Sequence, residues 1–150
     1  MSVSVQAAPF DPGAELSAFG VADGAGAVAS FTGHVRGDGG LVALEIEHWE
    51  GVTEAALEAL AAEARARWPL GALRVVHRHG RLRPGEPIVM VLAASPHRDA
   101  AFEAARFVMD ALKSRAPFWK KEVRAEGGAW VEARAADEAA LAAWGPLTRP

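Results

Sequence analysis

The stretch IVMVLAASPHRDAAFEAARFVMDALKSR, from Ile88 to Arg115, decides the fold. Its first part, IVMVLAAS, is a continuous apolar run, which is typical of a central strand covered on both faces. The rest predicts a helix over about 98–115, because apolar residues recur at helical spacing on one side: Ala101, Ala105, Val108 and Leu112.

Elements of both kinds are predicted outward from this stretch. Alternating or apolar segments indicate strands at 2–7, 26–36, 41–49, 73–80, 118–125 and 129–134. Further helices are expected at about 12–19, 53–68 and 137–144. Asp11 before Pro12 marks the start of the first of these helices, and Thr53 caps the second. We therefore predict an α+β fold with a mixed, largely antiparallel sheet, in a single domain over residues 1–150.

The composition excludes several classes of protein. Hydrophobic residues make up 51% of the chain, and no apolar run approaches the roughly 18 residues of a membrane span. The first residues lack the basic and apolar regions of a signal peptide, so we expect a cytoplasmic protein. A net charge of -3 argues against a general nucleic-acid binder. Without cysteine there is no thiol nucleophile or disulfide, so any sulfur that the chain handles arrives on another molecule.

Cationic side chains gather at the ends of the predicted elements. They are His34 and Arg36 after one strand, His97 and Arg98 at the start of the long helix, and Lys113, Lys120 and Lys121 near its end. His97 and Arg98 could grip a phosphate, because unpaired N–H groups at a helix N-terminus favour anions. The alternative is that His97 caps the helix and Arg98 is a solvated residue of its first turn.

The adjacent Lys120 and Lys121 cannot point the same way, because side chains alternate along a strand. Lys120 therefore shares a face with Phe118 and Glu122, and Lys121 shares the other face with Trp119. At most one of the two lysines enters a pocket that this strand lines. The alternative is that both lysines protect an edge strand from pairing with other chains.

Two pairs of residues have weaker claims to function. His77 and His79 share a strand face and could bind a metal, but no third ligand is apparent, so we expect no metal site. The alternative is a strand end packed against its neighbours. Glu45 and Glu47 alternate with apolar residues, which favours a solvated outer face.

Six segments run in the order of a known family over most of the chain: FTGHVRG, LEIEHWEGVTEAAL, ARWPLG, VVHRHGRLRPGE, SPHRDAAFEAARFVMDALKSRAPFWKKE and WVEAR. Together they resemble the large, catalytic subunit of molybdopterin synthase, the MoaE family. The resemblance implies an α/β-hammerhead fold, no cofactor, and conversion of cyclic pyranopterin monophosphate to molybdopterin. Sulfur would come from the C-terminal Gly-Gly thiocarboxylate of a small ubiquitin-like sulfur-carrier subunit. The assembly would be a heterotetramer built on a homodimer of large subunits.

The same resemblance carries the family's site onto Arg36, His97, Arg98, Lys113 and Lys120. The flanking His34, Val35, Lys121 and Glu122 are further substrate-binding candidates, and Arg134 is a looser match. In this view Arg36, His97 and Arg98 would hold the phosphate through charge-assisted hydrogen bonds. Lys113 and Lys120 would be catalytic, by stabilising the oxyanion of acyl transfer or by moving protons.

The length of the predicted helix has a geometric consequence. Arg98 and Lys113 are separated by about 22 Å, at about 1.5 Å of rise per residue. We therefore expect a site shared by two copies, with Arg36, Lys113 and Lys120 from one copy and His97, Arg98 and Arg134 from the other. A rival interpretation is a non-catalytic module for a phosphate ligand or a ubiquitin-like protein, which the same cations would serve.

Overall fold

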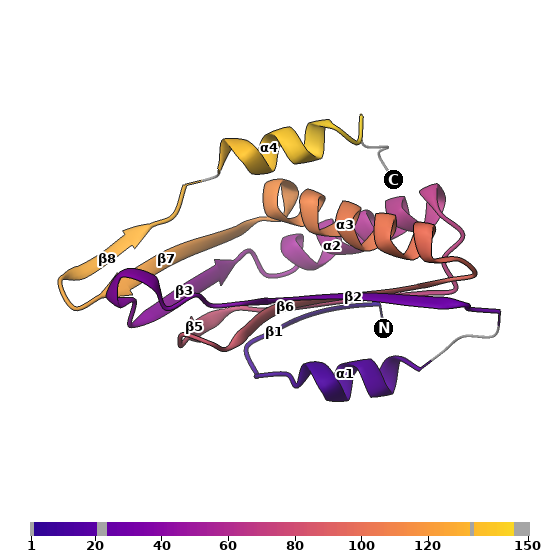
Figure 1. Ribbon diagram of the computed structural model, residues 1–150. Coiled ribbons are helices and arrows are strands. Elements are labelled where there is room, and N and C mark those ends of the chain that lie inside the picture. The colour runs from indigo at the N-terminus through magenta and orange to yellow at the C-terminus, as the bar shows by residue number, and fades with distance from the viewer. Residues whose placement is uncertain (1, 21–23, 133, 146–150) are drawn as a thin grey trace.

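Four α-helices and two four-stranded sheets form the part of the chain that the computed structural model describes, residues 2–20, 24–132 and 134–145 (Figure 1). The helices are α1 (Pro12–Phe19), α2 (Val52–Arg67), α3 (Arg98–Arg115) and α4 (Ala135–Ala142), with a short 3-10 helix η1 (Asp38–Gly40). The strands are β1 (Val3–Gln6), β2 (Ala27–His34), β3 (Ala43–His48), β4 (Ala72–Arg78), β5 (Gly80–Leu82), β6 (Pro87–Ser95), β7 (Phe118–Arg124) and β8 (Gly127–Trp130). The α+β class is confirmed.

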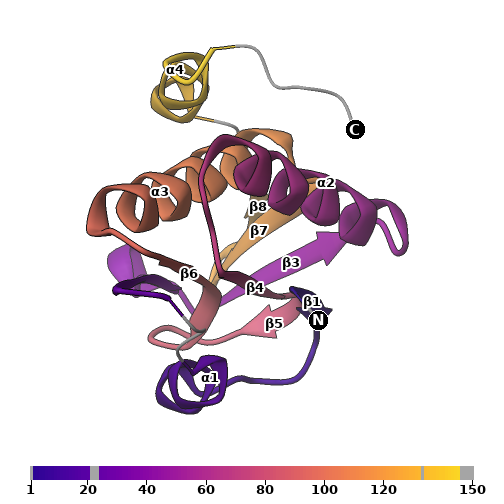
Figure 2. The ribbon, with the colours of Figure 1, turned by 90° about the vertical axis from the view of Figure 1, so that its right-hand side faces the viewer.

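The first sheet is built around β6 and has the strand order β1-β4-β6-β2. β6 pairs antiparallel with β2 and β4, and β1 pairs parallel with β4. Helices α2 and α3 lie side by side over one face of this sheet, and α1 lies on the opposite face (Figures 1 and 2). The prediction of a central strand covered on both faces is therefore confirmed, as is the helix at 98–115.

The larger hydrophobic core lies between this sheet and its two long helices. Val75 and Val91 from the sheet meet Leu57 from α2 and Phe107 from α3, and each of the four is at most 1% exposed. Two tryptophans extend the core toward α4. The Trp68 and Trp144 rings lie 5.4 and 5.7 Å from the Phe107 ring, and Trp144 Nε1 donates to Asp110 Oδ2 over 2.7 Å.

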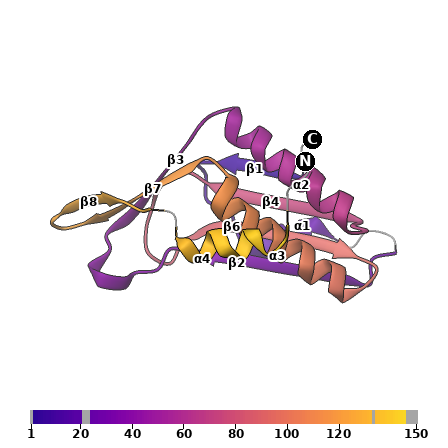
Figure 3. The same ribbon diagram turned by 90° about the horizontal axis from the view of Figure 1, so that it is seen from above.

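Helix α4 runs along α3, as the view from above shows (Figure 3). The Trp144 contacts fix its far end against α2 and α3, because the Arg67 guanidinium also donates to the Trp144 carbonyl over 3.1 Å. The N-terminal end of α4 therefore lies beside the C-terminal end of α3. None of the helices in the described ranges is long and apolar enough to cross a membrane.

The second sheet has the order β5-β3-β7-β8, and all its pairs are antiparallel. It has a small core of its own, formed by Val35, Leu44, Ile46 and Leu82. The β7–β8 hairpin extends beyond the helices (Figures 1 and 3), and the residues of β8 are exposed. Across both sheets, β1–β4 is the one parallel pair among the strands described here, so a mixed, largely antiparallel arrangement is confirmed.

Phe118 and Ile88 join the two halves, because each packs against both cores. The chain also passes directly from β4 of the first sheet into β5 of the second. At this junction the His77 ring stacks on the Phe118 ring, with centroids 3.7 Å apart and an angle of 16° between the planes.

Three details of the predicted elements are wrong. The N-cap of α2 is Gly51, whose N–H donates to Glu54 over 3.1 Å, and Thr53 is instead buried inside the first turn. The strand predicted at 129–134 ends at Trp130 as part of β8. The last helix begins at Ala135, two residues before the predicted start, with Arg134 as its N-cap.

Candidate active site

The end of α3 is where the two candidate catalytic lysines come together. Ala116 has φ −76° and ψ 132°, because the ring of Pro117 disfavours the helical conformation in the residue before it. The buried Thr53 hydroxyl donates to the Pro117 carbonyl over 3.1 Å and fixes this turn to α2. The chain therefore bends sharply from the helix that carries Lys113 into the strand that carries Lys120.

A cavity of about 190 Å³ opens beside this turn. We call it the lysine pocket, and its walls include His77, Lys113, Phe118, Lys120, Arg134 and Asp137. Strand β4, the end of α3, strand β7 and the segment that leads into α4 all contribute. Three predicted site residues, Lys113, Lys120 and Arg134, are thus brought together from parts of the chain that are separate in sequence.

Strand parity separates the two adjacent lysines as predicted. Lys120 lines the lysine pocket together with Phe118, whereas Lys121 lies on the opposite face, with its Nζ 5.8 Å from the centroid of the Trp130 ring. Trp119 shares that outer face and is 48% exposed. Glu122 shares the face of Lys120 but does not line the pocket, and its carboxylate pairs with Arg124 at 2.7 Å.

The lysine pocket lowers the pKa of Lys120. The main cause is burial of the ammonium group, followed by the positive charge of Lys113, while the carboxylate of Asp137 acts in the opposite direction. A lysine with a lowered pKa has a larger neutral fraction near pH 7. Such a group can exchange protons, and its ammonium form can stabilise a developing oxyanion.

His77 lines the same pocket from β4, with only 1% of its surface exposed. Burial lowers the pKa of His77 to about 3, assisted by the nearby Lys120, although the contact with the Arg78 carbonyl acts to raise it. The imidazole is therefore neutral near pH 7. The sequence offered His77 as half of a metal site or as part of a strand end packed against its neighbours, and its stacking on Phe118 agrees with the second interpretation.

The other histidine of that pair faces a different ring. His79 lies 4.1 Å from His48 between ring centroids, and burial followed by the charge of His48 lowers the pKa of His79. His48 Nε2 is in turn 4.0 Å from a Glu54 carboxylate oxygen. Over the ranges that the structure describes, no group of three or more His, Cys, Asp or Glu residues could hold a metal.

The candidates that follow β2 do not line the lysine pocket. The Arg36 side chain is 80% exposed and lies 3.7 Å from Asp38. His34 Nδ1 is 3.1 Å from the Gly85 carbonyl oxygen. Val35 is 4% exposed and belongs to the smaller core, so its side chain serves packing.

His97 and Arg98 lie at the opposite end of α3 from Lys113 (Figure 1). Both are exposed, and His97 occupies the N-cap without a side-chain cap hydrogen bond, while its carbonyl accepts from the Ser95 hydroxyl. One chain therefore does not bring these two cations to its own lysine pocket. Arg134, which was expected from a second copy, instead lines the pocket of its own chain.

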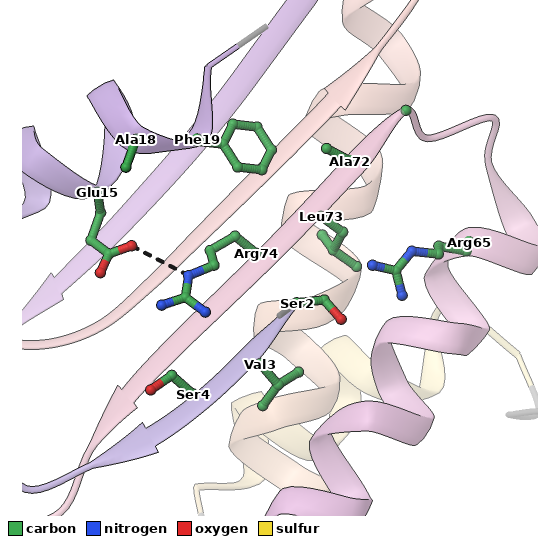
Figure 4. A pocket seen from close by; sticks show the side chains of 11 residues that line it. Ser2, Val3, Ser4, Glu15, Ala18, Phe19, Arg65, Ala72, Leu73 and Arg74 are labelled. Atoms are coloured by element: carbon green, nitrogen blue, oxygen red, sulfur yellow. Dashed lines mark hydrogen bonds and ion pairs between the residues drawn. The ribbon is translucent and has the colours of Figure 1, made fainter. Parts of the chain in front are cut away.

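The lysine pocket is smaller than a second hollow elsewhere on the molecule, so size alone would not select it. A larger hollow of about 860 Å³ lies between α1, β1, β4 and α2 (Figure 4). The Arg65 and Arg74 side chains extend into it, and Arg74 pairs with Glu15 at 3.3 Å. No predicted site residue within the described ranges lines this hollow, so it is not the candidate site.

Two residues of the lysine pocket were missed from the sequence. Strand alternation shows that His77 shares a face with His79, but it does not show which ring covers that face. Asp137 was interpreted only as the start of a helix. A histidine inside the apolar run VVHR was the one signal that could have indicated a buried polar function at this point.

Comparison with known proteins gives one consistent result. The family described as MoaE protein matches residues 5–115. The chain is 60% identical over 146 residues to the molybdopterin synthase catalytic subunit of Cereibacter sphaeroides, covering 96% of this chain and 100% of that protein.

Solved structures agree with the sequence comparison. The MoaE protein from Burkholderia ambifaria matches with a TM-score of 0.81 and 46% identity, covering 97% of this chain and 98% of that one. A molybdopterin synthase from Staphylococcus aureus matches with a TM-score of 0.81 and 29% identity, covering 88% and 98% of the two chains. The overall fold is thus one that these proteins share.

Proposed function

The chain belongs to the MoaE family, and from that premise we propose that it is the catalytic subunit of a molybdopterin synthase, a sulfurtransferase of molybdenum cofactor biosynthesis. The observation that carries the proposal is the convergence of Lys113 and Lys120 in one pocket. Binding a phosphate needs cations at the surface, but it does not need a half-buried lysine with a lowered pKa beside a second lysine.

The proposed reaction explains why amines and not thiols line the pocket. The chain has no cysteine, so sulfur enters as the C-terminal thiocarboxylate of a small ubiquitin-like carrier. Sulfur first bonds to a carbon of cyclic pyranopterin monophosphate, and a carbon–oxygen bond of that carbon breaks, so that the displaced oxygen leaves as water or stays on the phosphate. Water then adds to the carrier's acyl carbon, the acyl–sulfur bond breaks, and the carrier leaves with a carboxylate. Two such transfers produce the dithiolene of molybdopterin.

Addition of water to the acyl carbon places negative charge on the acyl oxygen. An ammonium group held in a partly dehydrated pocket stabilises that charge more strongly than one in bulk water. Lys120 meets this requirement because it is half-buried, and Lys113 lies beside it at the mouth of the same pocket. We assign both lysines to the acyl carbon and its protons.

With both lysines assigned to the acyl carbon, Arg134 is the one remaining cation of this pocket among the described residues, so we expect the phosphate of the substrate to need further cations. We propose that Arg36 supplies one of them and that His97 and Arg98 of a second copy supply the others. The mid-point between residues 98 and 113 lies between residues 105 and 106 of α3. A two-fold axis at that point would place Arg98 of each copy beside Lys113 of its mate.

The surface near that mid-point supports the shared site. Phe102 is 66% exposed and Phe31 is 44% exposed, and both line a hollow that reaches Lys113. Residues 102, 105, 106 and 109 of α3 line the same hollow, and they are placed symmetrically about the proposed axis. A second copy would cover these apolar side chains, which are otherwise in contact with water.

We further propose that residues 1–150 act as one domain in the cytoplasm. The two cores share Ile88 and Phe118, so neither sheet can move independently without exposing these side chains. The proposed partners, a pterin phosphate and a sulfur carrier, are soluble molecules.

The direct test supplies cyclic pyranopterin monophosphate and a thiocarboxylated carrier to the purified chain and measures the dithiolene product. The proposal predicts product with the natural chain and a loss of product with Lys120→Ala. Binding of both partners without product would instead support the non-catalytic module.

A further inference from the structure

We propose that His77 is a positioning residue whose Nε2 accepts a hydrogen bond from the Lys120 ammonium group and so fixes the orientation of that lysine. Its consequence for turnover rests on the proposed function. The proposed hydrogen bond involves residues of this chain alone and can be tested without substrate.

The contact with Arg78 determines which nitrogen of His77 is available. His77 Nδ1 lies 2.7 Å from the Arg78 carbonyl oxygen, and a carbonyl can only accept. The hydrogen of the neutral ring is therefore on Nδ1, and Nε2 carries a lone pair. The residues that the structure describes, Lys120 included, form no hydrogen bond to Nε2, so the proposed bond requires the flexible Lys120 side chain to turn toward this acceptor.

The ring that carries this acceptor is held firmly in place. His77 is 1% exposed, and its face is covered by Phe118 at 3.7 Å between centroids. The hydrogen bond to the Arg78 carbonyl restricts rotation of the ring about its Cβ–Cγ bond. Nε2 is not among the fully buried side-chain atoms without a partner, so this acceptor is open to the lysine pocket, where a donor can reach it.

Lys120 is well placed to be that donor. It follows Phe118 by two residues on the same face of β7, and both it and His77 line the lysine pocket. Its charge is among the causes of the lowered pKa of His77, which reflects their proximity. A lysine side chain has three donors on a flexible stem, whereas the neutral imidazole offers one acceptor in a fixed direction.

The surrounding charges define what the hydrogen bond would do. The charged and titratable groups that face this pair are Lys113 on α3, Glu132 and Arg134 before α4, Asp137 on α4, and His48 and His79 beside the ring. Burial and Lys113 disfavour the ammonium form of Lys120. A neutral acceptor favours that form without adding a second negative charge, so His77 would limit the fall in the pKa of Lys120.

Three substitutions separate this role from packing alone. His77→Phe keeps the stacked ring and removes both nitrogens. His77→Asn keeps a donor for the Arg78 carbonyl, but its shorter side chain places no acceptor at the position of Nε2. His77→Gln loses the ring but offers an amide oxygen near the position of Nε2. The probe is the NMR titration of Lys120 in protein labelled with ¹³C at the lysine ε-carbons, with Lys120→Arg used to assign the signal.

The proposal predicts that proton binding by Lys120 becomes about tenfold weaker in His77→Phe and His77→Asn, as expected for loss of one hydrogen bond to a charged group. His77→Gln should recover most of the difference. An unchanged Lys120 titration in folded His77→Phe would overturn the proposal. If His77→Phe does not fold, equal titrations in the Asn and Gln variants would overturn it instead.

The pH dependence of dithiolene formation gives a second measurement. The limb that reports Lys120 should move to lower pH in His77→Phe and return in His77→Gln, whereas loss of packing alone would lower the rate at every pH. If the natural chain makes no dithiolene, the proposed function fails. The NMR titration would still decide the role of His77.

Discussion

The two sheets of this protein differ in how they are stabilised. The first sheet is covered by helices on both faces, and its large core includes Val91 and Phe107, both fully buried. The second sheet has four residues in its core, and its edge strand β8 is exposed. Each sheet has four strands, so the difference lies in how completely helices cover them. We call the first sheet with its helices the first half and the second sheet the sparse half.

This difference explains where chemistry can take place. A lysine in the first core would be excluded from water and from substrate alike. At the boundary between the halves the helices end, and Lys120 can be half-buried while it remains in contact with a cavity. The first half thus provides a wall, formed by β4 and the end of α3, and the sparse half places the strand that carries Lys120 against it.

The largest expected effect tests whether the lysine pocket is the reactive part. Lys120→Ala should lower the turnover number by about 10²- to 10⁴-fold, because it removes an ammonium from the developing oxyanion or a group that moves protons. The measurement is the initial rate of dithiolene formation. Lys121→Ala is the matched control from the opposite face, and equal losses in the two variants would contradict the assignment of faces.

The next effect tests whether stability resides in the first half. Phe107→Ala should lower the free energy of unfolding by about 3–5 kcal/mol, because it leaves a cavity in the large core. Trp119→Ala, in the sparse half, should cost less than about 1 kcal/mol because the ring is 48% exposed. Urea unfolding measures both. Similar losses would show that the two sheets contribute equally.

The smallest effect concerns the junction of the halves. The pKa of His77 is about 3 in the folded chain and near 6.5 when unfolded, so its contribution to stability is present above pH 6.5 and is lost as the pH falls toward 3. Between pH 7 and pH 5 this loss should be about 2 kcal/mol. Urea unfolding at the two pH values measures it, and His77→Phe should lack this part of the pH dependence. If stability falls equally steeply with pH in His77→Phe, the pH dependence comes from other titratable groups.

The sequence predicted most of this fold because its strongest signals are local. The apolar run of β6 and the period of α3 need no knowledge of distant contacts, and Pro117 sets the end of α3 by its own geometry. Strand parity likewise separated Lys120 from Lys121. These predictions were confirmed because each depends on a few consecutive residues.

The parts that failed depend on contacts between distant segments. Thr53 resembles a helix cap, but its hydroxyl donates to Pro117, 64 residues away in sequence. The stacking of His77 on Phe118 joins two different sheets, and Arg134 reaches its pocket only because Trp144 holds α4 against α3. The periodicity of a sequence does not predict such contacts between distant segments.

We propose that the sparse half of one copy forms the reactive pocket and that cations from the opposite end of α3 in a second copy complete it. Mixing inactive Arg98→Ala chains with inactive Lys113→Ala chains tests this directly. One intact pocket per mixed pair should restore dithiolene formation to about one quarter of the natural rate, as expected for random exchange between symmetric pairs. If exchange of chains is verified and the mixture stays inactive, the site is not shared.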